Sequence, residues 1–534
     1  MTFSDLVPSC EVAGWCKTGF EPSLIYTETM HNTGLDSLGV LEQDGPQSIV
    51  DLVFHNSRRK AATPAIEWLS GKLTYGDLAP LVLRTAFHLR SLGVGVGDPV
   101  AIALGDHVDH LVSLLAVATL GAVILPIDVR WTEKEKAAVA HSFGAVLALI
   151  DDGAAPVADL TNSATDEAWH RSIAAAPLDF DLFVRGRSRP LALSLSSGTT
   201  GRPKGPLATH GQILNRLYIY TGSLGFRDTD RFMVASPLYF GGARYMSLAY
   251  LCLGGTLVLY PPPYSPRDFI DAMQQRDITS LFLVPTILRR LLETPFEGEI
   301  MFPQLRRLVS SGAVLHADER RAVKQKICSN FMNFYSSTEG GGVSVLDANA
   351  PDELSGSIGR VVLGAEVEIV DDQHKPVATG STGRIRYRGG SVAAGYHLDP
   401  EASKEAFRDG WYYPGDLAHF DTDGFLFLDG RAKDMIIRGG VNIYPNEIEE
   451  VLMRHAEVRD AAVTAMTSAE LGEEVVAFVV LHRPLKQHQL LEYCRLQLAP
   501  YKVPKLIVQV DELPRNSSGK VLKAKLLELL GRQP

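Results

Sequence analysis

Short apolar runs alternate with helical patterns through most of the chain, beginning at about residue 47. In the helical stretches apolar positions recur every three or four residues, whereas the runs between them are short and continuous. The runs that we interpret as strands are Pro99–Leu104, Val146–Asp151, Arg231–Ser236, Gly255–Leu259, Ser280–Val284 and Arg307–Ser310. Strands separated by helices form parallel β-α-β units, so we expect an α/β fold.

One uncharged stretch, Leu111–Ile127, could be mistaken for a membrane span. It is barely long enough to cross a bilayer, and it contains Gly121 and Pro126. We interpret it as a buried helix that ends at Gly121, followed by a short strand that Pro126 stops. No membrane span is therefore expected.

The pattern changes twice in the last third of the chain. Between about residues 355 and 430, short strands are separated by frequent Gly and Asp turns, which favours antiparallel sheet or a small barrel. After Arg431 a compact α+β unit of roughly 100 residues begins, a plausible second domain. Its predicted elements are helices at Glu447–His455, Leu485–Leu498 and Val521–Leu530, and strands at Ala461–Met466 and Val475–Leu481.

Composition narrows the function classes. Apolar residues make up 46% of the chain and charged residues 21%, which predicts a buried core rather than disorder. The 52 basic and 62 acidic residues give a net charge of −10, which argues against a nucleic-acid surface but allows a basic pocket for a phosphorylated small molecule. The five cysteines lack zinc-ligand spacing, and the first residues lack the pattern of a secretory signal. We therefore expect reduced thiols and a cytoplasmic location.

The strongest chemical signal is the segment 194–205, Ser-Leu-Ser-Ser-Gly-Thr-Thr-Gly-Arg-Pro-Lys-Gly, which follows the apolar Leu191–Leu193. Glycines let backbone N–H groups approach an anion, hydroxyls donate further hydrogen bonds, and Lys or Arg neutralises charge. The segment is not a P-loop, because Pro203 precedes the lysine and no Gly-Lys-Ser/Thr opens a helix. We predict a cradle for a polyphosphate; the alternative is a flexible surface linker.

Three weaker signals follow along the chain. Thr338-Glu339 lies in a hydroxyl-rich turn that suits Mg²⁺, although Glu339 could instead cap a helix. Asp416, in a tight turn, could hold ribose hydroxyls with Arg431 nearby; the alternative is a pair of ordinary β-turns. Lys520 follows a glycine at the expected start of the last helix, where the helix dipole disfavours a cation. A residue that breaks a local rule is a functional candidate, although Lys520 could also be a solvated surface lysine.

Taken together, these segments resemble the ordered signature of the adenylate-forming superfamily. That superfamily includes acyl-CoA synthetases, adenylation domains of nonribosomal peptide synthetases and beetle luciferases. The resemblance runs from about Ile49 to Lys525 and is greatest to AMP-forming acid–CoA ligases. It implies an α/β (α+β) fold with an irregular leader (1–46), a large N-terminal domain (47–432) of two mixed β-sheets with helices plus a distorted barrel, and a small mobile C-terminal domain (433–534).

The resemblance also implies the chemistry and the residues that perform it. The enzyme would activate a carboxylic acid with ATP to an acyl-adenylate, release pyrophosphate and transfer the acyl group to coenzyme A. Lys520 would bridge the carboxylate and the α-phosphate, Thr338 would touch the α-phosphate, and Glu339 would ligate Mg²⁺. The implied ATP contacts are Ser196, Ser197, Gly198, Thr199, Thr200, Gly201, Lys204, Ser311, Gly312, Ala313, Asn333, Phe334, Tyr335, Asp416 and Arg431. Lys433 would be the hinge, and Gly439 and Gly440 would line the pantetheine tunnel.

The acid is less well specified than the nucleotide. Many acyl-CoA synthetases carry a histidine near Phe240 and amino-acid-activating domains carry an aspartate, and neither is present, which argues against an α-amino acid. We expect a pocket for an aromatic or medium-chain acyl group, formed by Tyr239, Phe240, Gly241, Gly312, Gly340 and Gly341. Arg244 could bind a second carboxylate, but a structural ion pair is the preferred interpretation.

Three further readings stay open. The acceptor could be the phosphopantetheine of a carrier protein instead of free coenzyme A, since both present the same arm. A non-catalytic nucleotide sensor on the same fold is less favoured, and a luciferase-like oxidation least. We expect no nucleic-acid partner, and either a monomer or a homodimer.

Overall fold

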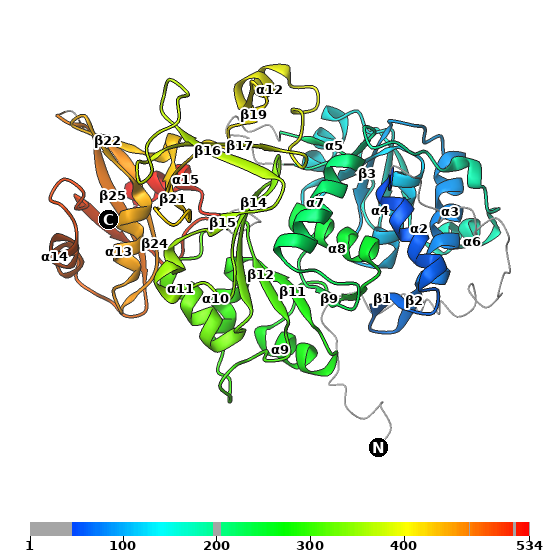
Figure 1. The fold of residues 1–534 in the computed structure, drawn as a ribbon, viewed down its shortest axis with the longest axis horizontal. Coiled ribbons are helices and arrows are strands. Elements are labelled where there is room, and N and C mark those ends of the chain that lie inside the picture. Colours follow the sequence, from blue (N-terminus) through cyan, green and yellow to red (C-terminus); the bar gives the residue numbers. More distant parts are fainter. Residues whose placement is uncertain (1–44, 196–203, 469, 516–519, 533–534) are drawn as a thin grey trace.

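The computed structural model describes residues 45–195, 204–468, 470–515 and 520–532. Figure 1 shows a large body that carries three sheets, with the C-terminal residues, in orange and red, forming a smaller sheet at one side. The expected leader lies outside the described residues except for its last two positions. The α/β fold class is confirmed.

The first sheet has the strand order β6-β5-β3-β4-β7-β8, parallel except for β8. Its strands are β3 (Pro99–Ala103), β4 (Val123–Pro126), β5 (Leu147–Ile150), β6 (Thr161–Ala164), β7 (Pro190–Leu193) and β8 (Leu207–Thr209). The helices of this part are α2 (Ile49–Arg59), α3 (Tyr75–Ser91), α4 (Val108–Thr119), α5 (Glu133–Ser142) and α6 (Glu167–Ala175). The predicted runs near residues 99 and 146 are β3 and β5.

The second sheet has nine strands in the order β15-β14-β13-β12-β11-β9-β10-β1-β2. They are β1 (Pro64–Trp68), β2 (Gly71–Thr74), β9 (Arg231–Val234), β10 (Thr256–Leu259), β11 (Ser280–Leu283), β12 (Arg307–Ser310), β13 (Phe331–Ser337), β14 (Gly341–Leu346) and β15 (Arg360–Val361). Its helices are α7 (His210–Ser223), α8 (Gly241–Leu253), α9 (Pro266–Gln275), α10 (Pro285–Glu293) and α11 (Ala317–Ala322). Strands β9 to β12 pair in parallel, as the four predicted runs require.

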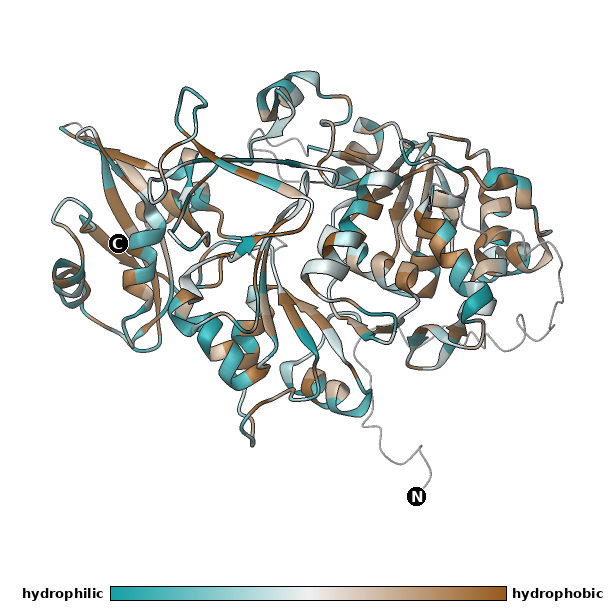
Figure 2. Ribbon diagram, in the orientation of Figure 1, coloured by the Kyte–Doolittle hydropathy of each residue, from teal (hydrophilic) through white to brown (hydrophobic). Residues whose placement is uncertain are grey.

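Helices α7 and α8 lie between these two sheets, as Figure 1 shows. Helix α7 contacts β8 of the first sheet and β14 of the second, and α8 packs on α7 and on β9 and β10. Figure 2 shows hydrophobic residues concentrated in the strands and in the helices enclosed between them. Side chains from these two helices can therefore reach both sheets.

The third sheet is the predicted antiparallel segment. It consists of β16 (Ala365–Val370), β17 (Gly383–Gly389), β18 (Phe407–Arg408), β19 (Trp411–Tyr412), β20 (Asp416–Phe420) and β21 (Leu426–Arg431), with α12 (Pro400–Ala406) beside it. All of its described pairings are antiparallel. The turn-rich texture of this part of the sequence therefore predicted the sheet type.

The C-terminal sheet has the order β23-β22-β25-β24, with β26 parallel to β25. Its strands are β22 (Ile436–Arg438), β23 (Val441–Ile443), β24 (Val458–Ser468), β25 (Gly472–Leu481) and β26 (Leu506–Gln509), and its helices are α13 (Pro445–Met453), α14 (Gln487–Gln497) and α15 (Lys523–Leu526). One expectation is wrong: the last helix begins at Lys523, not at Val521. Val521 instead forms an antiparallel bridge with Arg515, so Lys520 precedes the helix and the dipole argument for it does not hold.

The uncharged stretch before residue 128 has the predicted form. Helix α4 ends at Thr119, Gly121 follows with a positive φ of 65°, and β4 ends at Pro126. Among the helices that the structure describes, none is both long and apolar enough to cross a membrane. Cys252, Cys328 and Cys494, the cysteines within the described ranges, are free and buried.

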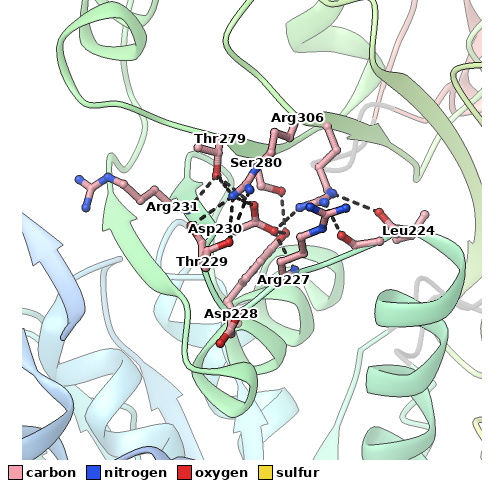
Figure 3. Close-up of polar contacts among 12 residues, drawn as sticks. Leu224, Arg227, Asp228, Thr229, Asp230, Arg231, Thr279, Ser280 and Arg306 are labelled. Atoms are coloured by element: carbon pink, nitrogen blue, oxygen red, sulfur yellow. Dashed lines mark hydrogen bonds and ion pairs between the residues drawn. The ribbon is translucent and has the colours of Figure 1, made fainter. Parts of the chain in front are cut away.

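A buried carboxylate, Asp230, joins the beginnings of several strands of the second sheet (Figure 3). Its Oδ1 lies 2.6 Å from Nη2 of Arg306 and accepts from Oγ1 of Thr279 at 3.1 Å. Its Oδ2 accepts from the Arg307 guanidinium and from the backbone N–H of Arg227, the latter at 2.9 Å. Because Arg307 is itself buried, this cluster is a compensated pair of opposite charges inside the fold.

Candidate active site

Asp416 is a buried carboxylate at the start of β20, directly after a glycine turn. Gly415 has a positive φ of 82°, which lets the chain turn into the strand. Asp416 pairs across the sheet with Arg431 at the end of β21, and its Oδ1 lies 2.9 Å from the Arg431 Nε. The hydroxyl of Tyr335, from β13, donates to Oδ2 at 2.6 Å. Burial and the Asp416 charge raise the pKa of Tyr335 well above its ordinary value, so it stays a neutral donor.

Lys520 approaches this carboxylate from the C-terminal unit. Burial of its ammonium lowers its pKa to about 8, helped by repulsion from Arg431 and Lys433, while Asp416 and Asp434 act in the opposite direction. The residue as a whole keeps much of its surface exposed. The structure therefore brings Lys520 into one electrostatic environment with Asp416 and Arg431, which lie about a hundred positions earlier in the sequence.

Glu339 lies in the turn between β13 and β14, where a side chain and a backbone N–H donate hydrogen bonds to it. It is buried, and its Oε1 accepts from the hydroxyl of Tyr396 at 3.1 Å. Lys204, the last residue of the predicted phosphate loop, lies with its Nζ 5.1 Å from the centre of the same tyrosine ring. The Thr338 carbonyl accepts from Nη2 of Arg216 at 3.1 Å. Tyr396 thus connects the loop lysine to the predicted metal-binding carboxylate.

The two segments predicted to hold adenine are neighbours in the second sheet. Ser310 pairs with Asn333 across the parallel strands β12 and β13, and Ser311 Oγ lies 3.0 Å from Ser336 Oγ. Alternate residues of β13 point to opposite faces. Tyr335 reaches Asp416, whereas the Phe334 ring packs in the core, with its centroid 6.2 Å from that of Tyr220. A contact of Phe334 with adenine would therefore have to come from its main chain.

The segment predicted to hold the acid connects β9 to α8. Phe240 precedes the first turn of α8 and stacks on Phe282 with ring centroids 6.3 Å apart. A Cβ on Gly312 would lie 3.5 Å from the Phe240 ring, and a Cβ on Gly242 would press on both rings. Tyr239 accepts a hydrogen bond from Arg130. Because Gly312 and Gly242 have no side chains, the Phe240 ring has room beside Phe282.

Three acid-pocket candidates have protein neighbours that fill the expected space. A Cβ on Gly340 would overlap the ring of Tyr387, and one on Gly341 would meet the Arg216 side chain. Arg244 is fully buried and donates to the carbonyl of Tyr239 at 2.7 Å. Within the described ranges no carboxylate forms an ion pair with Arg244, so the preferred interpretation of a structural ion pair is not what these residues show.

The predicted hinge and pantetheine residues lie on the C-terminal side. Lys433 is exposed in a short 3₁₀ helix, Ala432–Asp434, that joins β21 to β22. Gly439 and Gly440 form the turn of the β22–β23 hairpin, at the edge of the C-terminal sheet, with positive φ values of 56° and 82°. Two successive positive φ values are what a two-residue hairpin of this twist requires. Of the phosphate loop, Ser196, Ser197, Gly198, Thr199, Thr200 and Gly201 lie outside the described residues.

Residues that the sequence did not single out complete the surroundings. Tyr396, Arg216 and Tyr245 each touch a predicted site segment, yet none belongs to a hydroxyl- or glycine-rich motif. A conspicuous signal would have been the two arginines on otherwise apolar helix faces, Arg216 in α7 and Arg244 in α8. The roles of all these residues stay predictions.

Two family models match the chain. The model described as AMP-binding enzyme matches residues 53–397, and the model described as AMP-binding enzyme C-terminal domain matches residues 447–520. The first match alone spans more than half of the chain.

Curated relatives and solved structures agree with these matches. The chain is 34% identical over 464 residues to a feruloyl-CoA synthase from Amycolatopsis sp, covering 86% of this chain and 94% of the relative. It is 33% identical over 496 residues to an indoleacetate–CoA ligase from Aromatoleum aromaticum, covering 88% and 95%. The structure matches that of o-succinylbenzoate CoA synthetase from Bacillus subtilis in complex with its acyl-adenylate intermediate, with a TM-score of 0.81, 26% identity and coverage of 89% and 97%.

These similarities confirm the predicted superfamily and an acid–thiol ligase that uses ATP and coenzyme A and forms AMP. They extend over nearly the whole described fold, from α2 to the C-terminal sheet. The chain belongs to the AMP-binding enzyme family.

Proposed function

We propose that this ligase activates an aromatic carboxylic acid as its acyl-adenylate and transfers the acyl group to free coenzyme A. The observation that carries the proposal is the convergence of Lys520, Asp416 and Arg431 in one environment. Support for an aromatic acid comes from the Phe240–Phe282 stack and from the named acids of the relatives, ferulate and indoleacetate.

The chemical difficulty of the reaction explains why the site needs charged residues. A carboxylate is a poor electrophile, and its oxygen is a poor leaving group. In the first step a carboxylate oxygen attacks the α-phosphorus of ATP, the bond to the bridging oxygen breaks, and pyrophosphate leaves. In the second step a thiol attacks the acyl carbon and expels AMP. The protein contributes mainly positioning and the neutralisation of phosphate charge.

Each residue then has a task in the first step. Lys520, as an ammonium, screens the attacking carboxylate from the α-phosphate, while Asp416 accepts hydrogen bonds from the ribose hydroxyls. Arg431 and Tyr335 hold the Asp416 carboxylate in place. Lys204 and the loop before it neutralise the β- and γ-phosphates. For Asp416, the partners Arg431 and Tyr335 fix the charge before the substrate arrives.

Glu339 fits a magnesium ion that arrives with ATP. Mg²⁺ is commonly held by one or two carboxylates together with substrate phosphates and waters. Glu339 supplies one such carboxylate, and among the described residues no group of three or more His, Cys, Asp or Glu side chains could enclose a metal. The bound ion would neutralise phosphate charge, and Tyr396 would orient the Glu339 oxygen through its hydroxyl.

The second step requires a rearrangement of the C-terminal domain, which we place at residues 433–534 after the large domain 47–432. Lys520 lies near Asp416, whereas the Gly439-Gly440 turn is at the exposed edge of the C-terminal sheet. Rotation about Lys433 would withdraw Lys520 and bring the glycine turn to the acyl-adenylate.

We also propose that the enzyme acts in the cytoplasm.

The change Asp416→Asn is expected to raise the KM for ATP by about 10- to 100-fold, because a hydrogen bond to a charged group contributes about 1.5–3 kcal/mol. The amide keeps the size of the side chain but loses the charge that pairs with Arg431. Initial rates of pyrophosphate release at varied ATP check this.

The matched control for that change is Asp429→Asn, in the neighbouring strand β21. Asp429 is a partly buried carboxylate that accepts from His419 at 2.9 Å and from Thr382 at 2.7 Å. Its loss should leave the KM for ATP within about twofold. If both variants raised the KM equally, Asp416 would have no specific part in ATP binding.

A panel of acids tests the proposed substrate. Pyrophosphate release and thioester formation are scored with ferulate, indoleacetate, octanoate, malonate and phenylalanine, each with coenzyme A and without any carrier protein. We expect the highest kcat/KM with an aromatic acid and a thioester on coenzyme A. Exclusive activity with the amino acid or the dicarboxylate, or a requirement for a carrier protein, would overturn the proposal.

A further inference from the structure

Two buried arginines lie next to one tyrosine between the two large sheets. Arg216 of α7 is 3% exposed and Arg244 of α8 is fully buried. Each guanidinium carbon lies 4.9 Å from the centre of the Tyr245 ring, so the ring has a cation against it from both helices. We call these three residues the Arg–Tyr–Arg stack. Cations near an aromatic face are attracted by the ring quadrupole, more strongly when water is excluded.

The stack touches the segment expected to bind the acid. Arg244 donates from Nη1 to the Tyr239 carbonyl at 2.7 Å and to the Leu238 carbonyl at 3.2 Å. These two carbonyls belong to the turn that precedes Phe240. The Arg244 guanidinium is therefore one of the groups that hold this turn, together with the Asp106 carboxylate, which accepts from the Leu238 N–H at 2.7 Å.

The stack also touches both phosphate-binding segments. Ser194, directly before the phosphate loop, accepts from Nη2 of Arg244 at 3.0 Å, and its hydroxyl lies 2.8 Å from that of Tyr245. On the other side, Arg216 donates to the Thr338 carbonyl, and the Gly341 backbone packs against its Nε. Ser194 and the Thr338 carbonyl are thereby linked through Arg244, Tyr245 and Arg216.

The stack carries two positive charges without a carboxylate partner in the described part of the chain. Neither Arg216 nor Arg244 forms an ion pair there, and the sequence 196–203 contains no Asp or Glu. Buried charges are normally paired. Burial alone would raise the pKa of Tyr245, but Arg244 and Arg216 outweigh it and lower that pKa. The two guanidiniums therefore make the surroundings of the Tyr245 hydroxyl electropositive.

We propose that the Arg–Tyr–Arg stack couples the acid site to the ATP site, so that binding of one substrate fixes the segments that bind the other. Its three members are positioning residues, because they act through the backbone of the segments that contact substrate. Ordering the Tyr239 turn around an acid would fix Arg244, then Tyr245 and Ser194, which directly follows β7. This inference rests on the proposed function for the acid half, but its ATP half stands on geometry alone.

Tyr245→Phe is the sharpest variant, because it keeps the ring between the two guanidiniums and removes only the hydroxyl that meets Ser194. Calorimetry measures the Kd of α,β-methylene-ATP alone and with a saturating aromatic acid. We expect the variant to bind the analogue about fivefold more weakly, as the loss of one buried hydrogen bond implies. We also expect the acid to enhance analogue binding about fivefold less than in the wild type, since coupling energies of this kind are about 1–3 kcal/mol.

Tyr250→Phe is the matched control. Tyr250 is a buried tyrosine on the same helix, and its hydroxyl lies 2.6 Å from Ser280 Oγ, away from the stack. It should leave both Kd values within about twofold of the wild type. Arg216→Met should reduce the acid effect at least as much as Tyr245→Phe, and Arg216→Lys should restore part of it, since the ammonium can still donate to the Thr338 carbonyl.

The outcomes separate this inference from the proposed function. If the wild type releases pyrophosphate with an aromatic acid but Tyr245→Phe matches Tyr250→Phe in both Kd values, the coupling is overturned and the function stands. If no acid supports pyrophosphate release but Tyr245→Phe still weakens analogue binding, the function fails and the ATP half of the stack is supported. Equal weakening by both tyrosine variants would indicate general loss of packing and would also overturn the inference.

Discussion

Replacing Lys520 with alanine is expected to slow acyl-adenylate formation by about 10²- to 10³-fold, the cost of removing one positioned charge from a transition state. The reason is geometric: Lys520 shares an environment with Asp416 and Arg431, where the α-phosphate and the ribose would lie. ATP–pyrophosphate exchange in the presence of the acid measures this step. Thioester formation from preformed acyl-adenylate should change little, because the proposed rotation would withdraw Lys520 from the acyl-adenylate.

Lys525→Ala is the control for that experiment. Lys525 is exposed on α15, five positions further on, and its loss should leave both half-reactions unchanged.

The pH dependence of adenylation supplies a second check on the role of Lys520. Since the pKa of Lys520 is lowered to about 8, kcat/KM for adenylation should fall as pH rises through that value, when the ammonium loses its proton. Equal losses in the two half-reactions of Lys520→Ala would remove its assigned role.

Asp230→Ala is expected to be the most destabilising single change, at about 3–5 kcal/mol, because it leaves a buried cation without its partner. The Arg307 guanidinium would lose its carboxylate inside the sheet, and the backbone N–H of Arg227 and Oγ1 of Thr279 would lose their acceptor (Figure 3). Urea unfolding followed by tryptophan fluorescence measures the change. Expression as insoluble protein at ordinary temperature would agree with it.

Asp228→Asn, two positions earlier, provides the comparison. Asp228 also has a basic partner, Lys60 at 2.9 Å, but its side chain is half exposed. Surface ion pairs contribute about 0–1 kcal/mol, so this variant should unfold almost like the wild type. A similar loss of stability in the two variants would mean that burial of Asp230 does not set its importance.

Local sequence patterns predicted the helices and strands correctly wherever tertiary packing did not override those patterns. Buried parallel strands such as β5 form continuous apolar runs, and Pro126 and Gly121 mark boundaries because their backbone preferences hold in any context. The start of the last helix was misplaced because the apolar period continues back to Val521, which bridges to Arg515 instead. A hydrophobic period does not distinguish a helix from the strand-like segment that leads into it.

The site was predictable where one short segment holds the chemistry. Asp416, Glu339 and Lys520 each lie in a turn whose composition is unusual, and the structure brings two of them, Asp416 and Lys520, into one environment. Tyr396 and Arg216 were missed because their contacts with the predicted site come from distant parts of the sequence: Tyr396 contacts Glu339, 57 positions away, and Arg216 contacts Thr338, 122 positions away. The resemblance assigned the whole segment Asn333-Phe334-Tyr335 to the adenine, whereas the pleat of β13 decides which of its side chains point toward Asp416.

The central claim is that a carboxylate oxygen of the acid attacks the α-phosphorus of ATP. It can be tested by supplying the acid with both carboxylate oxygens labelled as ¹⁸O, together with ATP, Mg²⁺ and coenzyme A, and by analysing the released AMP by mass spectrometry. The account predicts one ¹⁸O atom in the phosphate of each AMP molecule, since the thiol later breaks the bond between that oxygen and the acyl carbon. Unlabelled AMP, or label found in pyrophosphate, would contradict it.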